Sequence, residues 1–299
     1  MSLSPSTRAL SAVVSRLRAA GCVFAEDEAA LLVAEARTPA DLAALVERRV
    51  AGLPLEHVLG WAEFCGLRVS VDPRVFVPRH RTEFLVRQAA ALAQPGAVVV
   101  DLCCGSGAVG AALLAALGRI ELHAVDVDPV AVRVARRNIA GRGHVHEGDL
   151  YEPLPPALRR RVDVLVANAP YVPTDEIDLL PPEARLHEPA VALDGGADGL
   201  DIHRRVAASA SRWLTPGGHL LVETSARQAR GTARIFADNG LAARITRSED
   251  LNATVVIGTA PGVANSGSRR ARSRGSDGGD SLRAKAAADA RRAARPVSA

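Results

Sequence analysis

The sequence predicts an α/β fold: an open, mostly parallel sheet preceded by a small helical region. From residue 97 onward, short apolar runs of strand length alternate with helical patterns, as a doubly wound sheet requires. Glycines cluster where the first of these strands gives way to a helix. The 299 residues, 48% of them apolar and 23% charged, are typical of a globular protein with one large domain or two ordinary ones.

The region before the sheet is predicted to be helical. Apolar residues between Thr7 and Val50 recur every three or four positions, and Pro39 followed by Asp41 indicates a helix start. Residues 61–71 alternate around a glycine like a β-hairpin, and residues 82–93 have a helical pattern that ends at a Gln-Pro-Gly turn. This stretch is expected to form a helical bundle followed by a hairpin.

Strands and helices of the sheet follow in alternation. The predicted strands are residues 97–101, 121–126, 144–147, 162–167 and 218–223, and the predicted helices are residues 108–117, 129–140 and 199–213. No insert of helix length separates residues 241–246 from residues 254–259. This last pair is therefore expected to form an antiparallel hairpin.

Charge is distributed unevenly along the chain. The net charge is +4, but residues 262–299 hold nine Arg and Lys against three Asp, which leaves 28 basic and 30 acidic residues elsewhere. This tail has few large apolar side chains and is expected to be disordered. The slightly acidic body argues against a nucleic-acid partner, except through the tail. We expect a helical domain over residues 1–60, a hairpin linker over 61–80 and an α/β domain over 81–261.

Other features exclude several classes of protein. No apolar run approaches 18 residues and the N-terminus lacks the pattern of a secretory signal, so a cytoplasmic protein without a membrane partner is predicted. The four cysteines show no CxxC spacing. We therefore expect neither a structural zinc site nor a disulfide framework, and no metal ligands.

The residues after the first strand predict a ligand site, because ligands of doubly wound sheets bind beyond the carboxyl ends of strands. Gly105, Gly107 and Gly110 match the GxGxxG pattern, with Asp126 19 residues after Gly107, as in a dinucleotide site. A pyrophosphate beside Asp101, however, would be repelled by roughly 4 kcal/mol per charge pair at 4 Å. S-adenosylmethionine, which carries a sulfonium and an ammonium group, suits this carboxylate better.

Two further carboxylates follow the next strands. Asp126 is placed to accept both ribose hydroxyls, and Asp149 to accept an adenine amino hydrogen or to cap a turn. Helix capping or turn formation remains an alternative for Asp101 and Asp126, as does a purely conformational role for the first two glycines. For Gly110, helix packing is favoured.

The stretch Asn168-Ala169-Pro170-Tyr171, after the fourth strand, predicts the reaction. A planar amino or amide nitrogen is a poor nucleophile, but two acceptors can hold its hydrogens and point its remaining face at a methyl group. The side-chain oxygen of Asn168 and the carbonyl of Ala169 or Pro170 are suitable acceptors, while Tyr171 packs over the planar group. Positioning supplies the catalysis without a strong base.

These two motifs, with several others, resemble the bacterial protein-glutamine methyltransferase family, which modifies the glutamine of peptide chain release factors. The resemblance covers residues 53–259. It also rests on Gly52–Leu55, Val58–Gly60, Glu63–Leu67, Pro78–Arg79, Thr82–Glu83, His187–Pro189 and Ala192–Leu200.

The resemblance implies a class I S-adenosylmethionine-dependent methyltransferase with a Rossmann-like, seven-stranded sheet. It implies that the helical domain grips a release factor, that residues 81–261 hold the cofactor, and that Asn168 and Pro170 grip the glutamine amide. Cys103 stands in the cofactor loop where the family has glycine, residues 80–81 read His-Arg where an acidic residue is usual, and Ala169 replaces a common proline. These departures indicate a divergent subfamily.

Some alternatives remain open at this stage. Arg79, Thr82 and Glu83 either line the cofactor pocket or fix the hairpin to the sheet, and residues 187–188 more simply shape a loop. An adenine amino methyltransferase acting on DNA or RNA would use the same Asn-x-Pro-Tyr logic. A nucleotide-binding module without catalysis is a third reading.

Overall fold

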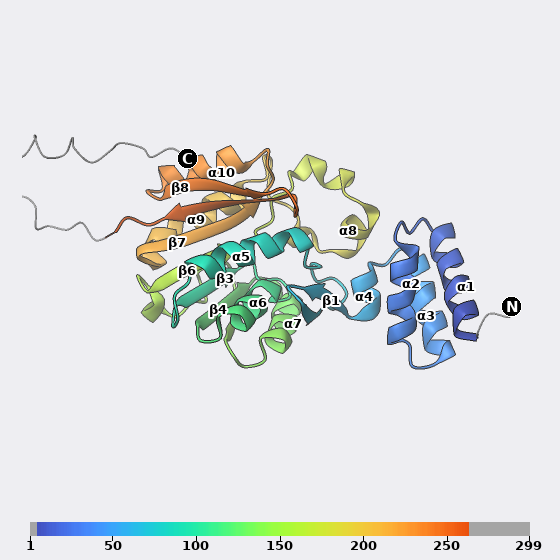
Figure 1. The fold of residues 1–299 in the computed structure, drawn as a ribbon. Coiled ribbons are helices and arrows are strands. Elements are labelled where there is room, and N and C mark those ends of the chain that lie inside the picture. The colour runs from blue at the N-terminus through green and yellow to red at the C-terminus, as the bar shows by residue number, and fades with distance from the viewer. Residues whose placement is uncertain (1–4, 263–299) are drawn as a thin grey trace, which may run out of the picture. The chain divides into compact units, whose positions relative to one another are not determined.

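The computed structural model describes residues 5–262 and shows a seven-stranded sheet covered by helices, with further helices at the N-terminus (Figure 1). The predicted α/β class, with a mostly parallel sheet and an antiparallel terminal hairpin, is confirmed. Within these residues no helix is both long and apolar enough to cross a bilayer. The tail prediction for residues 262–299 falls, apart from Gly262, outside the described residues.

Four helices precede the first strand: α1 (Pro5–Ala19), α2 (Ala25–Glu35), α3 (Pro39–Val50) and α4 (Leu55–Leu59). Residues 38–41 start α3 as predicted, because the threonine side chain at the cap accepts a backbone N–H at 3.1 Å. The sequence pattern does not indicate α4, because a helix of five residues is too short to show the helical repeat of apolar residues. The shared core of these helices comprises Val13, Leu17, Ala25, Ala29, Leu32, Val46 and Val58.

A two-stranded hairpin follows. Strands β1 (Trp61–Phe64) and β2 (Leu67–Ser70) pair antiparallel, as the alternation predicts. A short 3-10 turn then leads into α5 (Glu83–Leu92). The backbone N–H of Cys65 in the hairpin turn donates to the carboxylate of Glu83 at 3.1 Å. Glu83 thus fixes the hairpin to the helix that precedes the sheet, which supports that reading of the residue.

The main sheet has the strand order β5-β4-β3-β6-β7-β9-β8. The first five strands in this order are parallel to one another, and β9 is antiparallel to both β7 and β8. Each predicted strand is present, and β7 begins four residues earlier than predicted. The strands are β3 (Val98–Leu102), β4 (Glu121–Asp126), β5 (His144–Glu147), β6 (Val162–Ala167), β7 (Leu214–Thr224), β8 (Ala242–Ser248) and β9 (Ala253–Thr259).

Both faces of the sheet are buried under helices. Along β3, Val98 and Val100 belong to one apolar cluster and Val99 to the other, because successive side chains of a strand point to opposite faces. The cluster around Val99 is covered by α5 and α6 (Ala108–Leu117), and α7 (Pro129–Ile139) contributes to it. The other cluster is covered by α9 (Asp201–Trp213) and α10 (Ala229–Asp238).

Sequence analysis missed α10. Its buried residues Ala229, Thr232 and Phe236 are spaced by three and four, which is the helical repeat, but polar residues dilute the pattern. It also missed α8 (Pro182–His187), a helix that has no buried side chain.

The strand order reverses beside β3, because its two neighbours β4 and β6 lie on opposite sides of it in the sheet. The carboxyl ends of β3 and β6 therefore mark the position where such sheets bind ligands.

A buried ion pair connects the N-terminal helices to α8. The guanidinium of Arg49 on α3 donates two hydrogen bonds to Glu28 on α2, at 2.6 and 3.0 Å, and a third to Glu183 on α8 at 2.6 Å. Arg49 and Glu28 are almost entirely buried. Because a buried charge is tolerated only with its partner, this contact holds α2, α3 and α8 in one arrangement.

Replacing Arg49 with alanine would leave the Glu28 carboxylate buried without its counter-charge. We expect the free energy of unfolding, measured by urea titration, to fall by about 3–5 kcal/mol. The matched control is Arg16→Ala, which breaks the exposed Arg16–Glu47 pair and should change it by less than about 1 kcal/mol. Equal losses in the two variants would contradict this assignment.

Candidate active site

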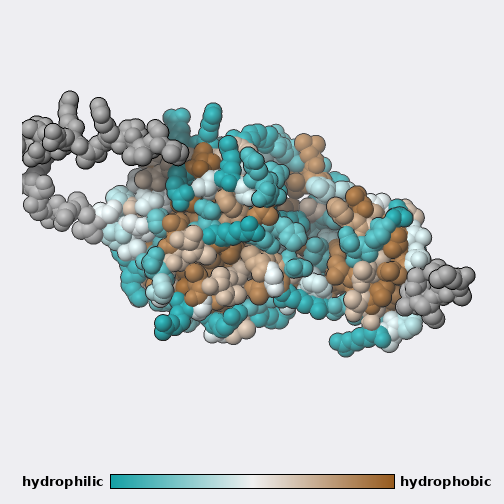
Figure 2. Space-filling view, in the orientation of Figure 1, coloured by the Kyte–Doolittle hydropathy of each residue, from teal (hydrophilic) through white to brown (hydrophobic). Residues whose placement is uncertain are grey.

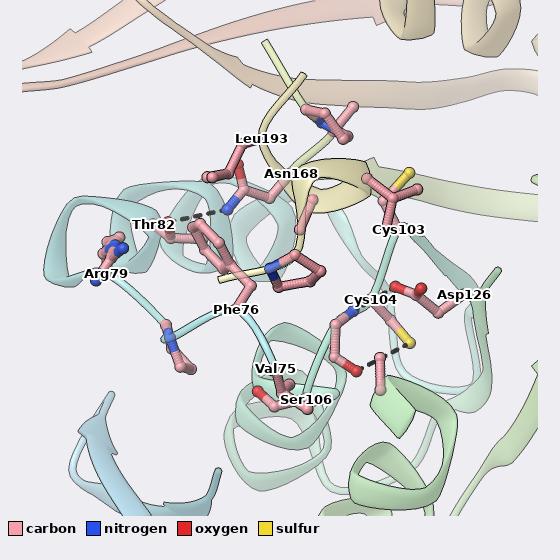
Figure 3. A pocket seen from close by; sticks show the side chains of 18 of the residues that line it. Val75, Phe76, Arg79, Thr82, Cys103, Cys104, Ser106, Asp126, Asn168 and Leu193 are labelled. Atoms are coloured by element: carbon pink, nitrogen blue, oxygen red, sulfur yellow. Dashed lines mark hydrogen bonds between the residues drawn. The ribbon is translucent and has the colours of Figure 1, made fainter. Parts of the chain in front are cut away.

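A cavity of about 760 Å³ opens at the carboxyl ends of β3, β4 and β6 (Figure 3). Its size is that of a typical small-molecule site. Of the residues that the sequence indicates as cofactor-binding or catalytic, Gly107 alone is absent from its lining. The others all contribute to the cavity wall: Asp101, Cys103, Gly105, Asp126, Asp149, Asn168, Pro170 and Tyr171.

The turn after β3 is hydrogen-bonded to the end of β4, since the backbone N–H of Cys104 donates to the carbonyl of Val125 at 3.0 Å. Cys103, Gly105 and Gly107 all have positive φ, at +55°, +53° and +74°. Cys103 thus occupies the left-handed region that favours glycine, at the position where the resemblance expects one. A Cβ on Gly107 would lie 3.0 Å from Ala135 of α7, so this glycine serves the start of α6 and its packing rather than the cavity wall.

Asp101 is the most buried acid of the cavity, with 1% of its surface exposed. Its Oδ2 accepts the backbone N–H of Gly110 at 3.0 Å, and burial raises the pKa of its carboxyl to about 7. A Cβ on Gly110 would lie 3.0 Å from Leu122, which supports the packing role favoured for this glycine. Asp101 forms no ion pair with any residue between 5 and 262.

Asp126 accepts two backbone N–H groups, from Gly105 at 2.8 Å and from Asp128 at 2.9 Å. Burial raises the pKa of Asp126, while these hydrogen bonds act in the opposite direction. It thus shapes the turn, and each of its oxygens keeps a second lone pair for a ligand. Asp149, in contrast, is half exposed and forms an ion pair with Arg205 of α9.

Asn168 leaves β6 and lies beside Thr82 (Figure 3). Its Nδ2 donates to the Thr82 hydroxyl oxygen at 3.4 Å, and the amide oxygen lies on the other side. The carbonyls of Ala169 and Pro170 accept no hydrogen bond within residues 5–262. Three acceptor oxygens of this loop thus have no hydrogen-bond partner within residues 5–262, and that of Pro170 lies against Gly195.

Hydrogen bonds from other segments hold the loop that follows Asn168 in place. The side-chain amide of Gln228 donates to the carbonyl of Tyr171 at 2.9 Å and to that of Asp198 at 3.0 Å. The N–H of Gly195 donates to the carbonyl of Val172 at 2.8 Å. Each of these carbonyls already accepts a hydrogen bond, whereas those of Ala169 and Pro170 accept none within residues 5–262.

The segment before α5 also lines the cavity. Arg79 and Thr82 lie in the wall, as one of the two readings expects, whereas Glu83 does not. Arg79 pairs at 2.6 Å with Glu188, whose buried carboxylate also accepts the N–H of Val77. Burial raises the pKa of Glu188, and the charge of Arg79 opposes this. Glu188 thus shapes the loop after α8.

Sequence reasoning missed Phe76, Leu193 and Glu223. The first two line the cavity from loops: Phe76 lies in a loop without a strand or helix pattern, and Leu193 in the stretch Ala192–Leu200 that the resemblance includes without giving it a role. Glu223 lies near the carboxyl end of β7, so the strand-end rule that selects Asp101 and Asp126 also applies to it. Within the described residues, no group of three His, Cys, Asp or Glu side chains is arranged to hold a metal ion.

Gly199 provides a test of this close packing around the Tyr171 carbonyl. It has φ +72°, and an added Cβ would lie 2.3 Å from both the carbonyl oxygen of Tyr171 and Nε2 of Gln228. Gly199→Ala is expected to lower the free energy of unfolding by about 1–3 kcal/mol more than Gly217→Ala, because overpacking adds to the backbone strain. Gly217 has φ +81° but open space around it. Chemical denaturation measures both variants, and equal losses would refute the close packing.

Comparison with known proteins gives consistent results. The methyltransferase small domain matches residues 73–181. The release factor glutamine methyltransferase of Geobacter sulfurreducens is 39% identical over 226 residues, which cover 74% of this chain and 78% of that protein. The protein of the same name from Mycolicibacterium smegmatis is 38% identical over 247 residues, or 80% and 87% of the two chains.

A solved structure supports the fold. The crystal structure of a methyltransferase from Pyrococcus furiosus superposes with a TM-score of 0.51 at 16% identity, covering 66% of this chain and 90% of that one. This match supports the α/β fold alone. The alignments with the two curated relatives, in contrast, cover most of both sequences. The chain therefore belongs to the release factor glutamine methyltransferase family.

Proposed function

We propose that this protein transfers a methyl group from S-adenosylmethionine to the side-chain amide nitrogen of a glutamine in a peptide chain release factor. The observation that carries this proposal is the placement of Asn168, with the free carbonyls of Ala169 and Pro170, in the same cavity as the buried carboxyl of Asp101. The relatives' names identify the substrate class. Peptide chain release factors act on ribosomes, so we assign the reaction to the cytoplasm.

The cavity fits this methyl donor by its charge. Asp101 is buried and Asp126 partly buried, burial raises the pKa of both, and no cationic side chain within residues 5–262 pairs with either. A cationic ligand would therefore offset the cost of their desolvation. Asp101 would face the cationic end, Asp126 the ribose hydroxyls and Asp149 the adenine, while the turn at Cys103 and Gly105 allows close backbone approach. When bound, the donor supplies an electrophilic methyl group on a positively charged sulfur.

The acceptors of the reacting loop suit a primary amide. Asn168 takes one amide hydrogen on Oδ1, and the carbonyl of Ala169 or Pro170 takes the other, so the nitrogen is held with one face open. Tyr171 packs over the amide plane. The nitrogen becomes acidic only after it has gained the methyl group, and no strong base is required before that. Positioning therefore accounts for most of the rate enhancement.

Protein docking is assigned to the N-terminal helices. We assign residues 1–60 to substrate binding, residues 61–80 to a linker and residues 81–261 to catalysis. Several large apolar side chains, Val23, Phe24, Leu31 and Leu186, are exposed on α2, on the turn before it and on α8. Figure 2 shows hydrophobic residues among hydrophilic ones over this part of the molecule. Exposed apolar side chains of this kind favour a protein partner.

The decisive experiment is incubation of the enzyme with labelled S-adenosylmethionine and a purified release factor, followed by peptide mass spectrometry. One methyl group on a glutamine side chain is expected. A parallel incubation with DNA and RNA tests the adenine alternative. Label on adenine and none on glutamine would overturn the proposal.

Asn168→Ala removes the side-chain acceptor. We expect kcat at saturating donor to fall by roughly 10- to 1000-fold, the equivalent of about 1.4–4 kcal/mol for a lost oriented hydrogen bond and looser positioning. Asn239→Ala, directly after α10 and outside the cavity wall, removes an amide that donates to the carbonyl of Ile235 and serves as the control. An unchanged rate in Asn168→Ala would exclude this residue from the mechanism.

The buried carboxyl of Asp101 makes donor binding depend on pH. Its pKa is about 7 in the free protein, and a cation binds to the ionised form. Donor affinity should therefore increase with pH up to about pH 7 and level off above it, by at most roughly tenfold per pH unit on the acid side. Isothermal titration between about pH 5.5 and pH 7.5 measures this. Asp101→Asn should bind weakly and with a flat profile, and a flat profile in the unmodified protein would refute the role.

A further inference from the structure

Arginines gather at the amino-terminal edge of the main sheet, which is the edge opposite the cavity. Arg161 directly precedes β6, and Arg119 and Arg212 lie two residues before β4 and β7. These strands belong to the parallel part of the sheet, so their amino ends meet at one edge. We call the exposed side chains there the arginine cluster: Arg119, Arg159, Arg160, Arg161 and Arg212.

Contacts between segments bring these arginines together. The backbone N–H of Arg160 donates to the carbonyl of Arg212 at 3.1 Å, which joins the start of β6 to the end of α9. On the other side, the Arg161 guanidinium reaches the carboxylate of Glu121 at 3.6 Å, two residues after Arg119. The cluster is therefore one continuous surface across the amino ends of β4, β6 and β7.

Most of this positive charge has no counter-charge. Arg161 is the single member of the cluster that forms an ion pair within residues 5–262. Arg160 donates to the carbonyl of Ser211 at 3.4 Å, and the Arg159 guanidinium lies 5.8 Å from the centre of the Trp213 ring. The carboxyl ends of helices attract cations in this way. A guanidinium has five N–H groups, however, so such contacts leave donors free for a ligand.

The chain leaves the described fold beside this cluster. Strand β9 is antiparallel to β7, so it ends at the edge where β7 begins (Figure 1). The N–H of Gly217 donates to the carbonyl of Ala260 at 3.2 Å, and a Cβ on Gly218 would lie 2.9 Å from the carbonyl oxygen of Val162. Residues 263–299 follow, and their sequence holds nine Arg and Lys against three Asp. The most basic part of the sequence is thus attached to the fold at this edge.

The chemistry of these arginines matches a phosphate backbone. Guanidinium groups bind phosphate oxygens through paired N–H donors. Segments rich in Arg, Ser and Gly bind single-stranded nucleic acids with little sequence preference, and residues 266–275 read Ser-Gly-Ser-Arg-Arg-Ala-Arg-Ser-Arg-Gly.

A membrane surface fits this edge less well, because helices that lie on membranes insert exposed apolar side chains. The large apolar side chains that are exposed within residues 5–262 belong to the N-terminal helices and to the cavity side of the fold. They are Val23, Phe24, Leu31, Val127, Leu179, Leu186 and Val191.

We propose that the arginine cluster binds the phosphate backbone of RNA, at the edge of the sheet opposite the cavity. RNA at this edge leaves the cavity open, so it anchors the protein and is not the methyl acceptor. The choice of RNA rests on the proposed function, because release factors act on ribosomes, which contain RNA. Binding by phosphate contacts releases counterions, so the affinity must decrease as the salt concentration rises.

Fluorescence anisotropy with a labelled single-stranded RNA of about 20 nucleotides and mixed sequence tests the proposal in the full chain. Arg161 is kept, because it pairs with Glu121. The cluster variant combines Arg119→Gln, Arg159→Gln, Arg160→Gln and Arg212→Gln. Each phosphate contact contributes roughly 0.7 to the slope of log affinity against log salt concentration, so this variant should flatten the slope by up to about 3. At about 100 mM salt, its affinity should be at least roughly tenfold weaker.

Two matched variants lose the same charge at other places. The control variant removes exposed arginines that form no ion pair within residues 5–262 and lie away from the cluster: Arg37→Gln, Arg133→Gln, Arg230→Gln and Arg247→Gln. It should change the affinity by less than about threefold, because charges more than about 10 Å away are screened at this salt concentration. The tail variant combines Arg269→Gln, Arg270→Gln, Arg272→Gln and Arg274→Gln. If it alone weakens binding, RNA binds only through the tail and the proposal is wrong.

Other outcomes are equally decisive. Equal losses in the cluster and control variants, or tighter binding of duplex DNA or of anionic lipid vesicles than of RNA, would overturn the proposal. Thermal unfolding and methylation of a release factor should be unchanged in the cluster variant, since the cluster lies outside the cavity wall. A flat salt dependence in the unmodified protein would refute RNA binding even if that variant were unstable. RNA binding is measured without methyl transfer, so its failure leaves the proposed function intact, whereas an absence of glutamine methylation refutes the proposed function alone.

Discussion

The main physical constraint on this protein is the burial of carboxylates where the parallel strands end. Parallel strands bring their carboxyl ends to one edge, and here that edge carries Asp101, Asp126 and, near the end of β7, Glu223. Each is desolvated, and burial raises the pKa of each. Such acids persist only where cations or hydrogen-bond donors compensate them. One oxygen of Glu223 has Arg81 and Tyr171 as partners and the other has none, whereas Asp101 has one backbone N–H and an open cavity.

This contrast divides the edge of the sheet into two parts. Near β3 and β4 the acids have no cationic partner among residues 5–262, and the backbone N–H of Gly105 donates a hydrogen bond to Asp126. Near β6 and β7 one oxygen of the Glu223 carboxylate is already held by the Arg81 and Tyr171 side chains. What surrounds each of these carboxylates therefore decides whether its charge is already paired within the protein or is open to the cavity.

Rigid contacts around the cavity connect it to distant parts of the chain. Gln228, at the start of α10, holds the carbonyl of Tyr171, and Arg79 holds Glu188 beyond α8. The Arg49–Glu183 contact extends this network to the N-terminal helices, to which we assign the protein substrate. Buried ion pairs and hydrogen bonds of this kind maintain a single arrangement, which a reaction that depends on positioning requires.

The sequence by itself determined the class of fold and the polar residues at the strand ends that line the cavity. Strand alternation, glycines after β3 and acids at strand ends are local signals, and they predicted Asp101, Gly105, Asp126 and Asn168 as neighbours. The sequence did not predict α8, nor did it predict α10, because polar residues dilute its helical pattern. Nor could it separate Gly107, which packs against Ala135, from Gly105, which lines the cavity.

Only the tertiary structure decided which groups are in contact across the sheet. Thr82 and Asn168 are 86 residues apart, and Arg81 and Glu223 are 142 apart. These contacts depend on the register of β6 with β7 and on the placement of the turn before α5, neither of which leaves a pattern in the sequence. Residue type shows what a side chain can donate or accept, but its partner is set by the three-dimensional packing of distant segments.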